Sequence, residues 1–366
     1  MTAQHAPPPS SSTANDTNVF SISDAHLAQR YQFIREIGAG NWGCVWLCSP
    51  KTDEPRAQAL SDDTARRVAV KLVFREKKPN TAQRVRSLWN EMKIVRALKQ
   101  DPHQSIIPFH SFIITPSFAI ITMEYLPYLI PVEVPEYRAR AWFRSLLSAV
   151  HFLHCRGVVH NDIKPANILL STRKVPKFVD FGFAEKYELG SKRAFLSNLA
   201  YGTPEYLSPE RARGKTHDTR KSDIWSLGIT FFEILVGRTP FEYVEGEKFT
   251  TPEDLERYWA RTVKGKWVGT WKMSSGAERM LRKMICPSTE ERCTASDAMT
   301  DPYWMEEIDA DGMSVNSSLM MMSTPAPGKT PTRVRKGEGK PMTPMGRENM
   351  RPLATKRSNL VHDGTS

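Results

Sequence analysis

Two acidic residues, an amide and a lysine stand close together in the middle of the sequence, between apolar runs. Asp162, Lys164 and Asn167 lie within "VVHNDIKPANILL", and Asp180 follows in "KFVDFGFAE". Carboxylate and amide oxygens are suited to Mg²⁺, which prefers carboxylates, waters and phosphate oxygens. Asp162 could also orient and deprotonate a hydroxyl nucleophile. For a single Asp in a turn, a helix cap or an Asx-turn is the better explanation.

Three glycines form a second motif, "IGAGNWGCV", between two strand-like runs. Gly38, Gly40 and Gly43 let the backbone approach a ligand closely and adopt conformations that other residues resist. A dinucleotide-binding fold would need a helix directly afterwards. The next run, "CVWLC", is β-like, so the glycines predict a hairpin that covers a ligand. A plain glycine turn is the alternative.

A lysine and a glutamate form the third motif. Lys71 lies on the alternating strand "RVAVKLV", and Glu91 follows 20 residues later on an amphipathic helix. Such an ion pair could hold an ammonium group against phosphate oxygens. The alternative for Lys71 alone is the solvated side of a strand. The order of all these motifs along the chain argues against the separate alternatives.

In that order, the chain resembles the eukaryotic protein kinases over roughly residues 30 to 305. The resemblance implies ATP as co-substrate, with Mg²⁺, and transfer of its γ-phosphoryl group to Ser or Thr hydroxyls of proteins. It implies that Gly38, Gly40 and Gly43 cover the ATP phosphates, and that Lys71, paired with Glu91, contacts them. It also implies that Asp162 is the catalytic base, that Lys164 steadies the transferred group, and that Asn167 and Asp180 bind Mg²⁺.

The same resemblance implies an adenine site and a peptide-docking loop. Val45, Ala69 and Leu169 are expected to sandwich the adenine, with Met123 as gatekeeper and the backbone of Glu124 and Leu126 reading its edge. In "GTPEYLSPE", Thr203 together with Lys164 is typical of the Ser/Thr type. Arg292 is expected to anchor Glu210, and Asp223 to brace the catalytic loop. The chain resembles calmodulin-kinase-like and related Ser/Thr groups.

The sequence departs from the family pattern at three places. The segment after "TMEYL" is short, so the helix expected there is truncated or missing, and Glu133 and Glu136 receive no role. Ala166 precedes Asn167 where kinases that prefer basic substrates often have Glu.

The third departure is Asn161, where most regulated kinases have an arginine that meets a phosphorylated residue. Ser87 and Glu185, at two positions that often assist it, are not basic either. A phosphate favours Arg and is repelled by a carboxylate. We therefore expect activity that does not depend on phosphorylation between Gly182 and Ser208, where Ser191 and Ser197 remain candidate sites. The alternative is a neutral substitution.

The elements that must position these residues change in character along the chain. Strand-like runs and one helix, marked by Val85, Leu88, Trp89, Met92 and Val95, precede Met123, and helices dominate afterwards. The expected strands are residues 31–37, 44–48, 67–73, 113–115 and 118–123, with a loop insertion at 49–66. The fold class is α+β, a two-lobed kinase fold with a small β-rich N-lobe (29–123) and a larger helical C-lobe (127–305).

Both ends of the chain have compositions typical of disorder. Residues 1–28 are rich in Ser, Thr, Pro and Asn, and residues 306–366 form a basic tail. From Gly312 to the end, nine Lys or Arg stand against three acidic residues, so this part of the tail carries more than half of the net charge of +11. Thr324, Thr330 and Thr343 each precede Pro, which predicts a partner kinase that is proline-directed; an inert tail is the alternative.

Composition favours a soluble protein in a reducing compartment, cytoplasmic and/or nuclear. The five cysteines are odd in number and scattered, and the first 20 residues do not resemble a signal peptide. No apolar run approaches the roughly 18 residues of a membrane span.

Three other functions compete with a protein kinase. A pseudokinase-type scaffold would be expected to lack Lys71, Asp162 or Asp180, and a small-molecule kinase would lack the peptide-docking loop. Binding of nucleic acid by the basic tail would depend steeply on salt, and we do not expect it.

Overall fold

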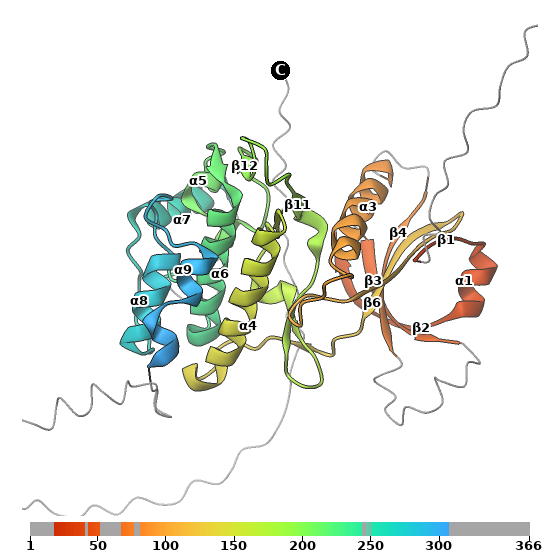
Figure 1. The fold of residues 1–366 in the computed structure, drawn as a ribbon, viewed down its shortest axis with the longest axis horizontal. Helices are drawn as coiled ribbons and strands as arrows, with labels where there is room; N and C mark the ends of the chain where they lie inside the picture. The colour runs from red at the N-terminus through yellow and green to blue at the C-terminus, as the bar shows by residue number, and fades with distance from the viewer. Residues whose placement is uncertain are drawn as a thin grey trace, which may run out of the picture.

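The computed structural model describes residues 18–40, 43–51, 67–76, 81–243, 247, 249 and 251–306. They form two lobes: a β-sheet with helices α1 and α3, and a larger helical part that contains α4 to α9 (Figure 1). The expected α+β architecture is confirmed. The expected tail and most of the 49–66 insertion lie outside the described residues.

The small lobe is built on a six-stranded sheet in the order β1-β5-β6-β4-β3-β2. Its central strand β4 pairs antiparallel with β3 and β6, so that Lys71 lies opposite Val45 on one side and Ile121 on the other. The expected strands are present, although β5 begins four residues earlier than predicted. The strands are β1 (Val19–Ser21), β2 (Tyr31–Gly40), β3 (Gly43–Pro50), β4 (Val68–Phe74), β5 (Phe109–Ile114) and β6 (Phe118–Glu124).

Helix α3 (Thr81–Ala97) covers one face of this sheet, as the apolar spacing predicted (Figure 1). Its buried residues include Leu88 and Met92, and Trp89 meets Phe112 of β5 edge to face with ring centroids 5.0 Å apart. Glu91 is among the buried residues of the helix. A buried carboxylate requires a partner, so the packing of α3 fixes where a cation must lie.

Residues 18–30 correct the expectation that residues 1–28 are disordered. Strand β1 pairs in parallel with β5, and helix α1 (Asp24–Arg30) lies on the face of the sheet opposite α3 (Figure 1). Leu27 is buried there with Val70, Leu72 and Ile113. The composition of the whole segment suggested disorder because the few apolar residues are diluted by a polar stretch before them.

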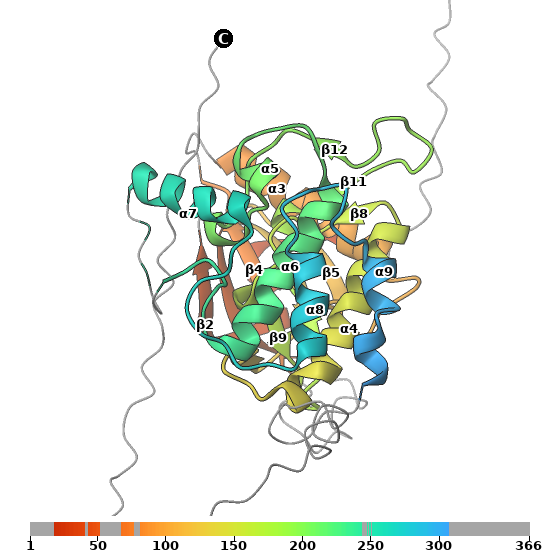
Figure 2. The same cartoon turned by 90° about the vertical axis from the view of Figure 1, so that its left-hand side faces the viewer.

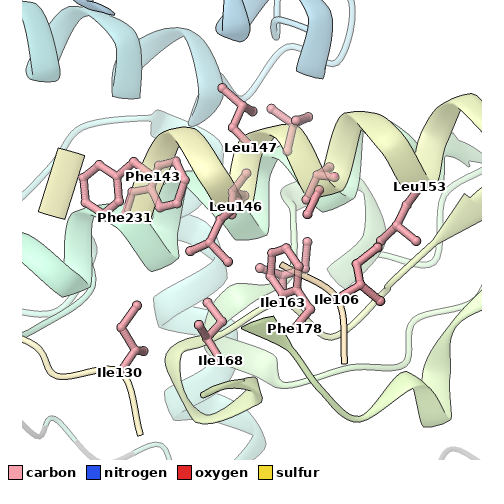
Figure 3. Packing of buried hydrophobic residues seen from close by; sticks show 14 of the residues in the cluster. Ile106, Ile130, Phe143, Leu146, Leu147, Leu153, Ile163, Ile168, Phe178 and Phe231 are labelled. Carbon is pink, nitrogen blue, oxygen red and sulfur yellow. The ribbon is translucent and has the colours of Figure 1, made fainter. Parts of the chain in front are cut away.

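The large lobe is organised around two long helices, α4 and α6. Helix α6 is buried over nearly its whole length, and Phe231 stacks on Phe143 of α4 with ring centroids 4.0 Å apart (Figure 3). Figure 2 shows α8 and α9 beside this pair and α7 farther out. The helices are α4 (Glu136–Cys155), α5 (Pro209–Ala212), α6 (Thr219–Val236), α7 (Pro252–Lys264), α8 (Ser275–Met284) and α9 (Ala295–Met299), and the 3-10 turn η5 (Pro302–Met305) follows.

Side-chain caps define where four of these helices, α6 to α9, begin. Thr294 and Asp297 form a capping box at α9, and Thr251 with Asp254 form another at α7. Helix α6 ends at Gly237, whose φ of 86° is the left-handed conformation typical of a glycine after a helix.

Short elements, one before α4 and the others between α4 and α6, flank the loops that hold Asp162, Asp180 and Thr203. Strand β8 pairs with β11, and β9 pairs with both β7 and β10, so the segment around Asp162 is held between small ladders. These elements are β7 (Tyr128–Leu129), β8 (Val158–Val159), η2 (Pro165–Asn167), β9 (Ile168–Leu170), β10 (Pro176–Phe178), η3 (Phe181–Phe183), β11 (Glu185–Lys186), β12 (Leu196–Ser197), η4 (Pro204–Tyr206) and β13 (His217–Asp218).

The segment after β6 contains no helix before α4, as the short sequence predicted; these residues all belong to the described part of the chain.

Glu136, which received no role from the sequence, has a structural role in the large lobe. Its carboxylate accepts hydrogen bonds from the backbone N and the Oγ of Ser274, both at 2.7 Å, at the start of α8. Glu136 therefore joins two helices of the large lobe.

None of the described helices has the length and hydropathy of a membrane span.

Candidate active site

A triad of charges joins the two lobes, and two of its members, Lys71 and Glu91, are buried while Asp180 is partly exposed. Lys71 Nζ lies 2.6 Å from Glu91 Oε2 and 2.8 Å from Asp180 Oδ1. Lys71 comes from the sheet, Glu91 from α3 and Asp180 from the turn before η3. The predicted Lys71–Glu91 ion pair is formed, and Asp180, 109 residues farther along the chain, is its third member.

The triad keeps its lysine charged. Burial works against the ammonium group, but the carboxylates of Asp180 and Glu91 outweigh this effect and raise the pKa of Lys71 above its usual range. Burial also opposes the charge of Asp180, and Lys71 outweighs it and lowers the pKa of that carboxyl. A cation and an anion are therefore both present near neutral pH.

The second group of side chains surrounds Asp162. Its Oδ1 accepts hydrogen bonds from the backbone N and the Oγ1 of Thr203, at 3.1 and 2.7 Å. Its Oδ2 accepts one from Asn167 Nδ2 at 2.8 Å and lies 2.9 Å from Lys164 Nζ. Lys164 also donates to Thr203 Oγ1. The docking loop thus reaches the candidate base directly, over 41 residues of sequence.

A buried carboxylate of α6, that of Asp223, holds the backbone of the loop that carries Asp162. Asp223 is 1% exposed, and it accepts hydrogen bonds from the backbone N of His160 and of Asn161, both at 2.9 Å. His154 of α4 lies 3.1 Å from the same carboxylate. The bracing expected of Asp223 is therefore formed. The His160 ring, at 4.8 Å from that of Phe181, packs under the DFG segment.

The residues expected at the nucleotide lie on neighbouring strands. Gly38 pairs with Val45 across β2 and β3, and Ala69 pairs with Met123 across β4 and β6. Gly43 has a φ of 142°, and a Cβ there would lie 2.2 Å from the carbonyl oxygen of Leu72. Glycine is therefore required at that position.

The remaining positions expected at the nucleotide are Gly40, Glu124, Leu126 and Leu169, which lie on different elements and are buried to different degrees. Gly40 ends β2, Leu126 is buried after the sheet, and Leu169 lies partly buried on β9. Glu124 donates its backbone N to Pro108 O at 3.3 Å, and its side chain pairs with Lys177.

The residues expected to hold Mg²⁺ have the right donor set. Asn167 uses its amide nitrogen on Asp162, which leaves the amide oxygen for a cation. Asp180 uses one oxygen on Lys71. Mg²⁺ is usually held by one or two carboxylates together with waters and substrate phosphates. A site of this kind needs no cluster of three or more His, Cys, Asp or Glu, and the described residues contain none.

The docking loop is anchored as expected. Arg292 binds Glu210 in a bidentate manner, with N–O distances of 2.7 and 3.0 Å, and is 1% exposed. Burial opposes the charge of Glu210, but hydrogen bonds from Arg292 lower the pKa of this carboxyl. A planar guanidinium matches a carboxylate in this geometry.

One residue near the site was not anticipated. Arg211, next to Glu210, is buried, and its Nη1 donates to Asn161 Oδ1 at 2.8 Å. Its position after "SPE" gives no signal by itself, because an arginine on a short helix is normally a surface residue.

Comparisons with known proteins agree with this geometry. Residues 31–304 match the family described as protein kinase domain. Sucrose non-fermenting protein kinase 1 of Fusarium virguliforme is 29% identical over 314 residues, which are 83% of this chain and 40% of that protein. Maternal embryonic leucine zipper kinase of Xenopus tropicalis is 26% identical over 76% of this chain and 40% of its own length.

A third relative is the serine/threonine-protein kinase SIK3 homolog of Danio rerio, 28% identical over 77% of this chain and 22% of its own length. The chain thus spans less than half the length of these three relatives.

Proposed function

Because this chain belongs to the protein kinase family, we propose that it transfers the γ-phosphoryl group of ATP to Ser and Thr hydroxyls of proteins. The observation that carries the proposal is the simultaneous assembly of Lys71–Glu91–Asp180 and of Asp162 with Thr203. A pseudokinase is not supported, since every one of these groups is present. The relatives named above are all named kinases, and one of them is named a serine/threonine-protein kinase.

The proposed mechanism depends on positioning and charge neutralisation. Lys71 binds α- and β-phosphate oxygens, and Glu91 orients its ammonium group. Asn167 and Asp180 hold Mg²⁺, which neutralises charge on the phosphates when bound. Asp162 orients the substrate hydroxyl and takes its proton, while Lys164 stabilises the transferred group and Thr203 fixes Asp162.

The experiment is a peptide-array assay with ATP and Mg²⁺, followed by kinetics on the best peptide. We expect Lys71→Met and Asp162→Ala each to lower kcat by about 10²-fold or more, the scale for losing a charge-stabilising or acid–base group. Activity of either purified variant within a few-fold of wild type would reject these roles. Phosphorylation of small alcohols instead of peptides would favour the small-molecule alternative.

We also propose that activity does not require a phosphate on the activation segment, the stretch between Gly182 and Ser208. Support comes from Asn161, a neutral residue, and from Glu185, whose carboxylate accepts a hydrogen bond from Tyr187 OH. Bacterially produced enzyme should keep its activity after phosphatase treatment and in a Ser191→Ala/Ser197→Ala double variant. A large loss in either preparation would refute this point.

The proline-directed sites of the tail remain a proposal of the same kind. Thr324, Thr330 and Thr343 lie outside the described residues, and support comes only from the Pro that follows each of them. We propose that a kinase active in the cell cycle modifies them in the cytoplasm or nucleus. Phosphopeptide mapping should find them occupied in cycling cells and not in arrested cells, and equal occupancy would contradict the idea.

A further inference from the structure

A buried arginine lies beside the catalytic loop and has no role in the chemistry above. Arg211 stands on α5 and is 2% exposed. Within the described residues, its guanidinium contacts a neutral amide and an aromatic ring, and forms no ion pair with a carboxylate. Burying a charge is costly unless its surroundings compensate it. Packing alone therefore does not explain an arginine at this position.

The amide of Asn161 is matched to this cation on one side and to the activation segment on the other. Its Oδ1 accepts from Arg211 Nη1 at 2.8 Å, and its Nδ2 donates to the backbone O of Phe183 at 3.0 Å. A guanidinium can only donate and a carbonyl can only accept, so the two partners fix the orientation of the amide. An aspartate would turn a carboxylate toward Phe183 O, and an arginine would turn a second cation toward Arg211.

The backbone at this position also favours asparagine. Asn161 has a φ of 67°, in the left-handed region, where Asn is several-fold enriched over most other residues. Asp223 holds this conformation by accepting the backbone N–H of Asn161. The loop that carries Asp162 is therefore fixed by α6 through its backbone and by α5 through the Asn161 side chain.

Tyr201 brings the far end of the activation segment into the same cluster. The guanidinium of Arg211 lies 4.8 Å from the centroid of the Tyr201 ring, and that ring stacks on Phe183 at 5.5 Å. Burial and a hydrogen bond to Glu185 raise the pKa of Tyr201, so its hydroxyl stays protonated. A cation over an aromatic face is stabilising, more so when it is desolvated.

We propose that Arg211 is a positioning residue for phosphoryl transfer. Through Asn161 and Tyr201 it connects the catalytic loop with both ends of the activation segment, and no phosphate is needed. This inference rests on the proposed kinase activity and supplies a physical reason for its independence of phosphorylation. A buried guanidinium, built into the chain, takes the place of a contact between an arginine and a phosphate.

The test compares phosphatase-treated wild type with Arg211→Met, Arg211→Lys and Asn161→Gly, using a peptide selected from the array. The glycine variant removes the amide without straining the positive φ. We expect kcat to fall about 10- to 100-fold in Arg211→Met and Asn161→Gly, the scale of a lost hydrogen bond to a charged group. The KM for ATP should stay within about twofold, and Arg211→Lys should recover part of the loss.

Arg213→Met is the matched control, because Arg213 follows α5 and pairs with the exposed Glu256 at the surface. It should leave kcat unchanged. The double variant Arg211→Met/Asn161→Gly should lose less than the product of the two single losses, because both single variants remove the contact between Arg211 and Asn161.

The outcomes separate the proposals. No transfer by wild type rejects the kinase assignment, and loss of wild-type activity on phosphatase treatment rejects phosphorylation independence. Active wild type together with a kcat of Arg211→Met equal to that of Arg213→Met rejects the role of Arg211. If Arg211→Met does not fold, Asn161→Gly decides the question in the same way.

Discussion

At the scale of single residues, the site is governed by buried charges whose partners come from distant segments. Lys71 Nζ lies within 2.8 Å of a carboxylate oxygen of Glu91 and of one of Asp180. Arg211 and Asn161 form a further contact, which is buried, next to Asp162 in the sequence of the catalytic loop. In both cases a side chain that would be costly to bury alone is stabilised by a partner that the fold supplies.

Glu233 of α6 offers a test of such burial through pH. Its carboxylate accepts a hydrogen bond from Tyr206 OH, and burial raises its pKa to about 7, with Glu242 and Glu205 adding to the effect. A carboxyl with a raised pKa binds its proton more tightly in the folded chain. Its contribution to stability is therefore full below about pH 4.5 and is lost as the pH rises through 7.

We therefore expect Glu233→Gln to raise the melting temperature relative to wild type more at pH 8 than at pH 5, by a few degrees. Thermal unfolding at the two pH values measures this difference. Glu253→Gln, at an exposed position on α7, is the control and should show no such dependence. An equal effect of Glu233→Gln at both pH values would contradict the raised pKa.

At the scale of elements, the small lobe depends on a segment that precedes the family match. Strand β1 and helix α1 begin before residue 31, and α1 covers one face of the sheet with Leu27, which is 3% exposed. Asp24 also accepts a hydrogen bond from Ser117 Oγ at 2.8 Å, in the turn before β6. The sheet that carries Lys71 therefore has helices on both faces.

Leu27→Ala should destabilise the protein by about 2–5 kcal/mol, because it removes buried methyl groups and leaves a cavity. Gln29→Ala, at an exposed position of the same helix, should have little effect. Thermal or urea unfolding compares the two variants. Equal melting temperatures would show that α1 contributes little to the stability of the sheet.

At the scale of the whole molecule, the two lobes meet through the charges of the site. Asp180 belongs to the large lobe, whereas Lys71 and Glu91 belong to the small one, so the triad forms only when the lobes are correctly placed. Within the large lobe, the ion pair between Arg292 and Glu210 holds the docking loop in place. Asp223 of α6 holds the loop that carries Asp162 through its hydrogen bond to the backbone of His160. Catalytic geometry is thus a property of the assembled molecule.

The sequence by itself determined most strands of the small lobe, helix α3 and the identity of the candidate site residues. Apolar patterns predicted β2, β4 and α3, because one or both faces of each element must be buried. The motifs predicted the Lys71–Glu91 pair and the contact between Glu210 and Arg292. These features follow from local pattern and from a fixed order along the chain.

The tertiary structure decided which residues share a buried environment. Leu27 could be recognised as a core residue only once the outer face of the sheet was known. Glu136 found its partner at Ser274, 138 residues away. The role of Arg211 could be recognised only from its contact with Asn161, because the sequence does not distinguish a buried arginine from an exposed one. A buried charge needs a partner to offset its cost, and only the packed fold specifies which residues are buried.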